Sequence, residues 1–164
     1  SFVIYHPHTP FATLIYRLKY GGREDIGEEI GRMIAADYMP SGFFEGIDAI
    51  VPMPLHKRRR RERGYNQSNE VARGISQLTQ IPVREDIVER VRYTQSQTQT
   101  TASSRSTNVS GAFALKQGQH PSGMHILLID DIITTGATLT ACATEIAKLE
   151  DVTISIMTIG RTED

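Results

Sequence analysis

One stretch of the chain, residues 126–138, constrains the fold more than any other. It begins with four apolar residues, continues with Asp130 and Asp131, and then passes through a threonine-rich loop around Gly136. A short, uninterrupted apolar run is typical of a strand covered on both faces of a parallel sheet. A loop of glycine and hydroxyl residues between such a strand and a helix is typical of a phosphate site at the strand's carboxyl end.

The residue types in this loop suit an anion. Backbone N–H groups of the loop and of the following helical turn carry partial positive charge, and Gly136 allows close approach or a positive φ. Two carboxylates beside a bare phosphate would repel it, so we expect ribose hydroxyl groups or Mg²⁺ to lie between Asp130, Asp131 and the phosphate. The predicted phosphate-binding residues are Thr134, Thr135, Gly136, Ala137 and Thr138.

Residues 126–138 do not match two common nucleotide-binding motifs. The chain contains neither G-x-x-x-x-G-K-[ST] nor G-x-G-x-x-G, which excludes a Walker loop and a dinucleotide fingerprint. A buried strand, an Asp cap and a threonine-rich turn without any ligand would use the same residue types. We disfavour that alternative because the pattern specifies many positions at once.

The remaining apolar periodicity alternates helices with strands. Helices are expected around residues 11–18, 26–34, 71–78 and 139–146, and strands over residues 47–51, 87–91, 126–129 and 152–156. This alternation predicts an α/β fold with a mainly parallel sheet. A length of 164 residues without internal repeats predicts a single domain over residues 1–164.

Composition restricts the possible partners of the chain and its cellular compartment. The net charge is -1, so any affinity for nucleic acid needs a local patch. The only cysteine, Cys142, falls in the apolar stripe of a predicted helix, which indicates a core residue and a reducing cytoplasm. No apolar run approaches the roughly 20 residues that span a bilayer, so no membrane insertion is expected. His6 and His8 lack a third ligand and are interpreted as incidental.

Residues 126–138 resemble the 5-phosphoribosyl-1-pyrophosphate (PRPP) motif of type I phosphoribosyltransferases. The resemblance implies PRPP as substrate with Mg²⁺ as cofactor. Asp130 and Asp131 would meet the ribose hydroxyls as catalytic residues, with Mg²⁺ nearby, and the loop would hold the 5′-phosphate. It also implies the type I fold, a parallel-rich sheet with helices on both faces and a small hood, to which residues 1–40 would contribute.

Further motifs resemble the ComF family (ComFC/GntX-like) of that superfamily. They follow family order over nearly the whole chain: residues 18–21, residues 51–56, residues 61–68, Thr94 with Gln97, Arg105 with Asn108, and residues 111–113. Two features depart from the family. The usual four-cysteine zinc module is not in this chain, and Thr100 stands where leucine is frequent. The resemblance implies a link to natural competence and DNA uptake.

Residues 94–110 are rich in Gln, Ser and Thr and almost devoid of apolar residues. Such a segment inside a domain predicts a long mobile loop with a function, although a surface loop without one is the alternative. The resemblance implies a loop that closes over PRPP and excludes water from an oxocarbenium-like centre. Arg105 is its only charged residue and is therefore a candidate catalytic residue that meets pyrophosphate.

The densest positive segment is residues 57–63, with the sequence KRRRRER. The resemblance places the pyrophosphate loop here, and the candidate pyrophosphate-binding residues are Pro52, Met53, Pro54 and Arg63. Arginine forks suit pyrophosphate oxygens. A different interpretation is contact with single-stranded DNA through Arg58, Arg59, Arg60 and Arg61. A solvated basic face is the third.

The residues after this segment leave similar choices open. Tyr65 would stack on a base or else lie in the core. Arg63, Gly64, Asn66 and Gln67 are typical of a polar turn before a helix, which Asn66 or Ser68 would cap if the turn has no other role.

The leading hypothesis is transfer of a phosphoribosyl group from PRPP to an unknown acceptor with release of pyrophosphate. No residue stands out as a general base for the acceptor. The second hypothesis is a competence factor that binds single-stranded DNA and the DNA-uptake machinery, with the PRPP site as a sensor or relic. The third is a PRPP-dependent regulator without catalysis. The oligomeric state stays open.

Overall fold

The computed structural model describes residues 3–5, 24–92, 111–118, 120, 122–133 and 135–162. The helices are α2 (Glu24–Tyr38), η1 (Met39–Ser41), α3 (Lys57–Arg63), α4 (Gln67–Thr79) and α6 (Ala137–Ile146). The strands are β1 (Val3–Tyr5), β2 (Ala49–Pro52), β3 (Val88–Arg90), β4 (Phe113–Leu115), β5 (His125–Ile133) and β6 (Thr153–Thr162). The predicted helix around residues 11–18, the segment 94–110 with Arg105, and Thr134 lie outside the described residues.

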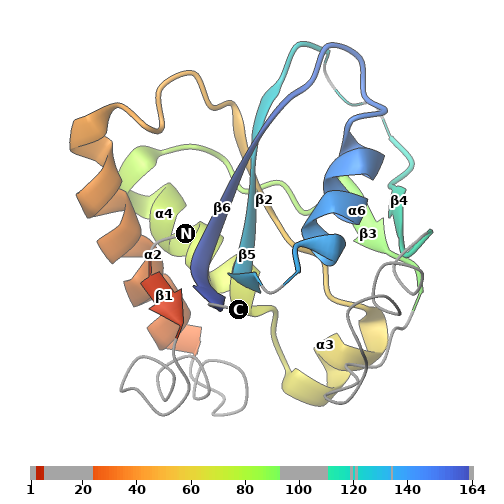
Figure 1. The fold of residues 1–164 in the computed structure, drawn as a ribbon, viewed down its shortest axis with the longest axis horizontal. Coiled ribbons are helices and arrows are strands. Elements are labelled where there is room, and N and C mark those ends of the chain that lie inside the picture. Colours follow the sequence, from red (N-terminus) through yellow and green to blue (C-terminus); the bar gives the residue numbers. More distant parts are fainter. Residues whose placement is uncertain are drawn as a thin grey trace.

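Four strands form a parallel sheet in the order β1-β6-β5-β2, and β3 pairs with β4 as an antiparallel hairpin (Figure 1). Helices α2 and α4 lie on one side of the parallel sheet, whereas α6 and the hairpin lie on the other. This arrangement confirms the predicted α/β fold with helices on both faces of a parallel sheet.

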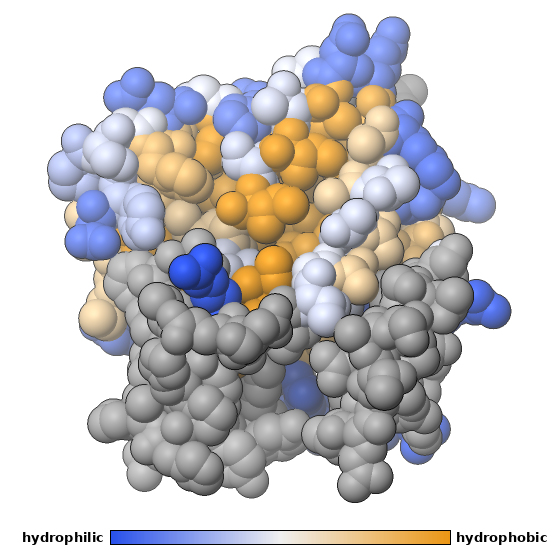
Figure 2. All heavy atoms as spheres, in the orientation of Figure 1, coloured by the Kyte–Doolittle hydropathy of each residue, from blue (hydrophilic) through white to orange (hydrophobic). Residues whose placement is uncertain are grey.

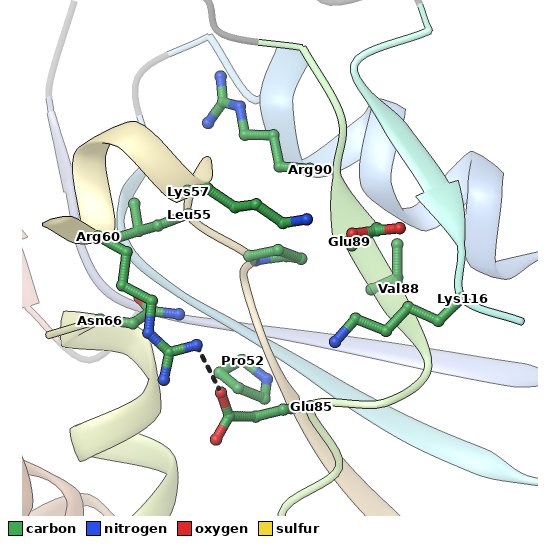
Figure 3. A pocket seen from close by; sticks show the side chains of 11 residues that line it. Pro52, Leu55, Lys57, Arg60, Asn66, Glu85, Val88, Glu89, Arg90 and Lys116 are labelled. Carbon is green, nitrogen blue, oxygen red and sulfur yellow. Dashed lines mark ion pairs between the residues drawn. The ribbon is translucent and has the colours of Figure 1, made fainter.

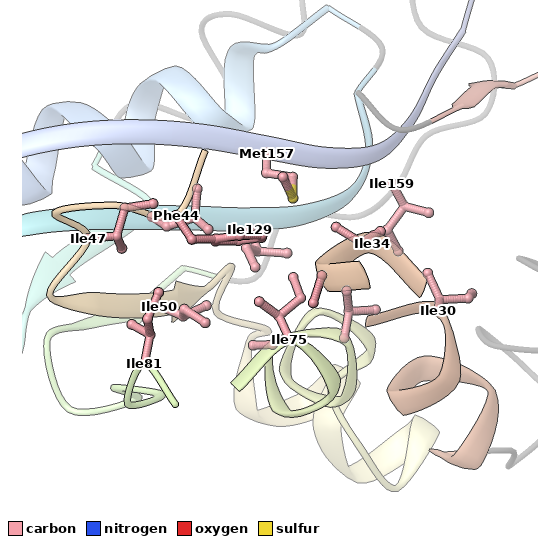
Figure 4. Close-up of a cluster of buried hydrophobic side chains, with 14 of the residues drawn as sticks. Ile30, Ile34, Phe44, Ile47, Ile50, Ile75, Ile81, Ile129, Met157 and Ile159 are labelled. Carbon is pink, nitrogen blue, oxygen red and sulfur yellow. The ribbon is translucent and has the colours of Figure 1, made fainter. Parts of the chain in front are cut away.

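Strand β5 lies inside the sheet, between β6 and β2, and its side chains alternate between two cores. Leu127 and Ile129 belong to a cluster with α2 and α4, which Figure 4 shows, whereas Ile126 and Leu128 belong to a cluster with α6 and the hairpin. All four side chains are buried. The continuous apolar run is therefore explained by burial on both faces, as the sequence predicted.

Helices α2 and α4 approach each other closely at two glycines. A Cβ atom on Gly31 would clash with the carbonyl oxygen of Val71, and one on Gly74 would clash with the carbonyl oxygen of Glu28. Both obstacles are backbone atoms, which cannot rotate away. The glycines therefore allow the apolar stripes of the two helices to meet, including Ile30, Ile34 and Ile75, which lie in the cluster shown in Figure 4.

The fold differs from the prediction at several points, and strand β1 was not predicted. Strand β5 continues four residues past Ile129, so the two aspartates are strand residues, and Asp130 pairs with Thr158 of β6. The basic segment forms helix α3. Strand β4 was missed, and it pairs with β3 across the segment 93–110. The expected contribution of residues 1–40 to a hood stays a prediction; within that range α2 packs against α4.

An apolar region lies on the face of the molecule that Figure 2 shows. Ile156 of β6 is 48% exposed, and Figure 2 shows apolar side chains over the part of the sheet that β6 occupies. Among the described residues, no helix combines the length and apolar character needed to cross a bilayer.

Candidate functional site

The two aspartates stand at the carboxyl end of β5, where the apolar residues of the strand end. The Oδ1 atom of Asp130 accepts hydrogen bonds from the backbone N–H of Asp131 at 2.8 Å and from the Ser68 hydroxyl at 3.5 Å. The Oδ1 atom of Asp131 accepts from the backbone N–H of Ile132 at 2.6 Å. Successive strand residues point to opposite faces, so the two carboxylates diverge. They present oxygens on two sides of the strand end.

A small cavity of about 50 Å³ joins Asp130 to the loop before α6. Thr135, Gly136, Ala137 and Thr138 line it, whereas Asp131 does not. Gly136 has a φ of 74°, a left-handed conformation that favours glycine, and it precedes α6 as its N-cap. The first N–H groups of a helix have no acceptor within the helix. The structure thus brings four of the five predicted phosphate-binding residues to one cavity with Asp130.

The loop after β2 forms another side of this region. Met53 donates its N–H to the carbonyl of Ile129 at 2.7 Å, which extends the pairing of β2 with β5 by one residue. The Met53 carbonyl accepts a hydrogen bond from Nδ2 of Asn66 at 3.0 Å, and the Met53 side chain is buried. Neither Asn66 nor Ser68 caps α4: Asn66 makes no capping bond, and Ser68 reaches Asp130 instead. The alternative of simple helix capping by these side chains is therefore wrong.

The start of α4 is unusually polar for a buried segment. Asn66, Gln67, Ser68, Asn69 and Glu70 are each at most 7% exposed. In the described part of the chain, Asn66 Oδ1, Gln67 Nε2 and Asn69 Oδ1 have no hydrogen-bond partner. Buried polar atoms almost always have one, and each exception needs a physical reason. A polar turn was predicted here, but its burial was not.

Arg90 of β3 is a site residue that the sequence did not reveal. Its guanidinium carbon lies 5.4 Å from the centre of the Phe113 ring of β4. Burial, followed by the charge of Arg59, lowers the pKa of Arg90, while the nearby charge of Asp130 opposes that change. The Arg90 guanidinium therefore interacts electrostatically with Arg59 of α3 and with Asp130 at the end of β5. The sequence offered only one indication of this site residue: a single arginine in a predicted strand just before the polar segment 94–110.

The basic segment is a seven-residue helix, α3, without a buried residue. His56 caps it by accepting from the Arg58 N–H at 3.2 Å. Part of its charge is engaged: Arg58 pairs with Glu62 at 3.0 Å, and Arg60 lies 3.6 Å from Glu85. Tyr65, which follows the helix, is buried in the core next to α2 and α4, so it is a core residue and does not stack on a base.

The remaining candidates fall into two groups. Pro52 and Pro54 line a second cavity (Figure 3), which Met53 and Arg63 do not line. The roles of these four residues with pyrophosphate stay a prediction, as does that of Arg105. Cys142 is fully buried in α6, as predicted, and burial raises the pKa of its thiol to about 12. Within the described ranges, no three His, Cys, Asp or Glu residues group to hold a metal ion.

Sequence comparisons agree with this geometry. A family model described as a phosphoribosyl transferase domain matches residues 61–159. Competence protein F of Haemophilus influenzae is 30% identical over 163 residues, which cover 97% of this chain and 71% of that protein. The DNA utilization protein YhgH of Shigella flexneri is 28% identical over 156 residues, which cover 93% of this chain and 68% of that protein.

A comparison with solved structures gives the same fold. An adenine phosphoribosyltransferase superimposes with a TM-score of 0.55 and 12% sequence identity, over 84% of this chain and 70% of the other. At that identity the likeness concerns the fold alone. It agrees with the parallel sheet covered by helices that the structure shows.

Proposed function

The chain belongs to the ComF family of phosphoribosyl transferase domains, and on this premise we propose that it binds PRPP with Mg²⁺ and transfers the phosphoribosyl group to an acceptor. Pyrophosphate is the leaving group. The observation that carries the proposal is the cavity at the end of β5, where Asp130 meets the loop residues 135–138. A carboxylate and an anion-binding loop that line one cavity fit a ligand that carries a diol and a phosphate on one sugar.

The parts of PRPP would be held by different elements. The loop before α6 would bind the 5′-phosphate through its N–H and hydroxyl groups, aided by the helix dipole. Asp130 and Asp131 would accept hydrogen bonds from the ribose hydroxyls. The Ser68 hydroxyl and the Asp131 N–H, which donate to Asp130, would hold that carboxylate in orientation.

The residues also fit Mg²⁺. Carboxylate oxygens are its preferred protein ligands, and it commonly keeps several waters while it bridges one or two carboxylates to substrate phosphates. Two aspartates without a third protein ligand in the described part of the chain suit such a shared site. When bound, Mg²⁺ supplies charge neutralisation at the pyrophosphate oxygens.

Cations would stabilise the leaving group. Charge accumulates on pyrophosphate as its bond to C1 breaks, and fixed positive groups lower the energy of that state. We assign this role to Arg90, because its guanidinium interacts with the charge of Asp130 and lies against the Phe113 ring. Arg105 and Arg63 remain candidates for the same role.

A pyrophosphate-release assay with PRPP, Mg²⁺ and a panel of nitrogen and oxygen nucleophiles tests this proposal. We expect release with at least one acceptor, and a loss of at least about 100-fold in the variant Asp130→Asn/Asp131→Asn, because the removed charges act on the reacting sugar. Asp37→Asn, which changes an exposed aspartate of α2, is the matched control. Release at the parental rate by the double variant would contradict the proposal. Binding of PRPP without release would favour a regulator.

A second function, binding of single-stranded DNA, has its own supporting observation. Six of the seven residues of α3 are basic, and none of the seven is buried. Lys57, Arg60 and Arg61 also line an open hollow with Gly64. The names of the relatives refer to competence and DNA utilization. Such a helix suits the phosphate backbone of a nucleic acid, whose binding weakens steeply with salt.

Replacement of Arg58, Arg59, Arg60 and Arg61 by alanine separates the two functions. We expect the affinity for a single-stranded oligonucleotide to fall more than the affinity for PRPP, with the log–log salt slope reduced by about 0.7 for each lost phosphate contact. Alanine favours helix, so α3 should persist. Arg32→Ala/Lys148→Ala removes two cations outside α3 as a control. Loss of PRPP affinity by a protein that never bound DNA would assign α3 to pyrophosphate.

A further inference from the structure

Strand β6 has two edges, and one of them is only partly occupied. Along one edge β6 pairs with β5 from Thr153 to Arg161. Along the other edge β1 pairs with residues 160–162, and no other strand of the described part of the chain pairs there. The first half of β6 therefore has one edge without a partner strand among the described residues.

The backbone of this half of β6 directs polar groups toward that open edge. Thr153 donates its N–H toward β5, to the carbonyl of Met124 at 2.9 Å. The direction of the backbone groups alternates from one strand residue to the next. The N–H and C=O groups of Ile154 and Ile156 therefore point away from β5. Such a row of unpaired groups is a template for another strand.

The open edge lacks the features that usually prevent pairing with another chain. Edge strands are commonly protected by charged side chains, by proline or by a bulge. Residues 152–158 have the sequence VTISIMT, with neither charge nor proline, and their register with β5 is constant. Ile156 is 48% exposed, and Figure 2 shows apolar side chains at the surface over this part of the sheet. A partner that covers the edge would explain why it carries no protection.

The edge is complementary to a second copy of itself. A twofold axis at Ile154 makes the two strands antiparallel, and the two Ile154 residues then form a hydrogen-bonded pair. Val152 lies opposite the partner's Ile156, so aliphatic side chains meet on one face of the sheet. On the other face Thr153 lies opposite the partner's Ser155, and such hydroxyl pairs stabilise sheets. No charged side chain opposes another in this register.

We propose that two copies of this chain associate through residues 152–156 of β6, which pair antiparallel and join the two four-stranded sheets into one continuous sheet. Strand β1 confines the contact to this half, because it occupies the same edge at residues 160–162. The cavity at the carboxyl end of β5 stays open, since the contact lies at the opposite end of the sheet. One short strand from each copy makes a small interface, so the dimer is weak.

Sedimentation velocity and hydrogen–deuterium exchange, at chain concentrations from about 10 µM to about 500 µM, test this interface. We expect a monomer–dimer equilibrium. Exchange at the amides of Ile154 and Ile156 should slow as the concentration rises, because those N–H groups are bonded only in the dimer. Exchange at Thr153, whose N–H is bonded to Met124 in both states, should not depend on concentration.

A charged variant separates this edge from the rest of the surface. Ile156→Lys should raise the dissociation constant at least about tenfold, because a lysine on an edge strand opposes pairing. Met33→Lys changes an apolar residue of α2 that is 54% exposed and is the matched control. A parent that stays monomeric without slowed exchange at Ile154, or equal losses in both variants, would overturn the proposal. Urea denaturation of both variants checks that they fold.

Cysteine variants test the register. Thr153→Cys mixed with Ser155→Cys should form a disulfide between copies under mild oxidation, because Cα atoms of such opposite residues lie about 4.5 Å apart. Each variant alone should cross-link at least about fivefold more slowly, since its own cysteines are diagonal neighbours about 7–8 Å apart. Cys142 is buried and does not compete. Single variants that cross-link as fast as the mixture, or a mixture that never does, would contradict this pairing.

Discussion

The first turn of α4 and the core-facing side of the rest of the same helix are both buried, yet they bury opposite kinds of side chain. Residues 66–70 are polar, and three of their side-chain atoms lack partners in the described part of the chain. Val71, Ala72 and Ile75 are apolar and fully buried against the core, with Gly74 in close contact with α2. The buried side chains change from polar to apolar within one turn of α4, next to Asp130, which Ser68 contacts.

The difference separates two reasons for burial. Apolar burial stabilises the fold by roughly 25 cal/mol for each Å² removed from water. A buried polar atom without a partner costs about 1–3 kcal/mol, so it does not serve stability. The later part of α4 therefore holds the fold together. The first turn is explained by a ligand that supplies partners, and Ser68, which contacts Asp130, ties that turn to the proposed site.

The largest effect is expected in the apolar part. Gly74→Ala places a methyl group against the Glu28 carbonyl, so α2 and α4 must move apart. Overpacking of this kind lowers the free energy of unfolding by about 1–3 kcal/mol or more, which urea denaturation measures. Leu78→Ala, at an exposed position of the same helix, is the control and should change little. Equal stability of Gly74→Ala and the parent would refute the close helix contact.

A smaller change, of different sign, is expected in the first turn. Asn69→Leu replaces a buried amide, whose Oδ1 has no partner in the described part of the chain, by an apolar side chain of similar size. The free energy of unfolding should stay within about 1 kcal/mol of the parent or rise, because an unsatisfied group is removed. The affinity for PRPP should fall about tenfold, as isothermal titration calorimetry can measure. A loss of stability as large as that of Gly74→Ala, with PRPP binding intact, would assign Asn69 to the fold.

The thiol of Cys142 in α6 is a polar group that is buried in the apolar core, like Val71, Ala72 and Ile75 of α4. Burial raises the pKa of its thiol from 9.0 to about 12, so the folded protein keeps it neutral. Iodoacetamide at pH 8 should label the unfolded chain but not the folded one. Its contribution to stability is complete below pH 9 and is lost as the pH rises toward 12, because only the unfolded thiol ionises in that range. Rapid labelling of the folded protein would contradict this.

The sequence predicted those elements whose pattern reflects burial of apolar groups. The stripe of Val71, Ala72 and Ile75 indicated α4, and the apolar run of β5 indicated a strand covered on both faces. The end of β5 was missed because its aspartates are polar, although Asp130, Ile132 and Ile133 remain paired with β6. Helix α3 was missed because a wholly exposed basic helix has no apolar periodicity.

The sequence predicted the site only where the site residues are close together in the chain and form a motif. Asp130 and the loop residues 135–138 are close in the chain, so the motif alone placed them together. Arg90 and the buried amides depend on distant partners: the hairpin needs β4, which follows β3 after more than 20 residues, and Asn66 needs the Met53 carbonyl. Polar residues ordinarily predict exposure, so their burial becomes visible only in three dimensions.

The proposed function depends on binding of PRPP at the carboxyl end of β5. Isothermal titration of PRPP with Mg²⁺ into the parent chain and into Asp130→Asn/Asp131→Asn, with urea denaturation of both, tests it most directly. We expect saturable binding by the parent and a loss of at least about 100-fold in the variant. The free energy of unfolding should change little, because both aspartates are only partly buried. Equal binding by both proteins, or no binding by a folded parent, would contradict it.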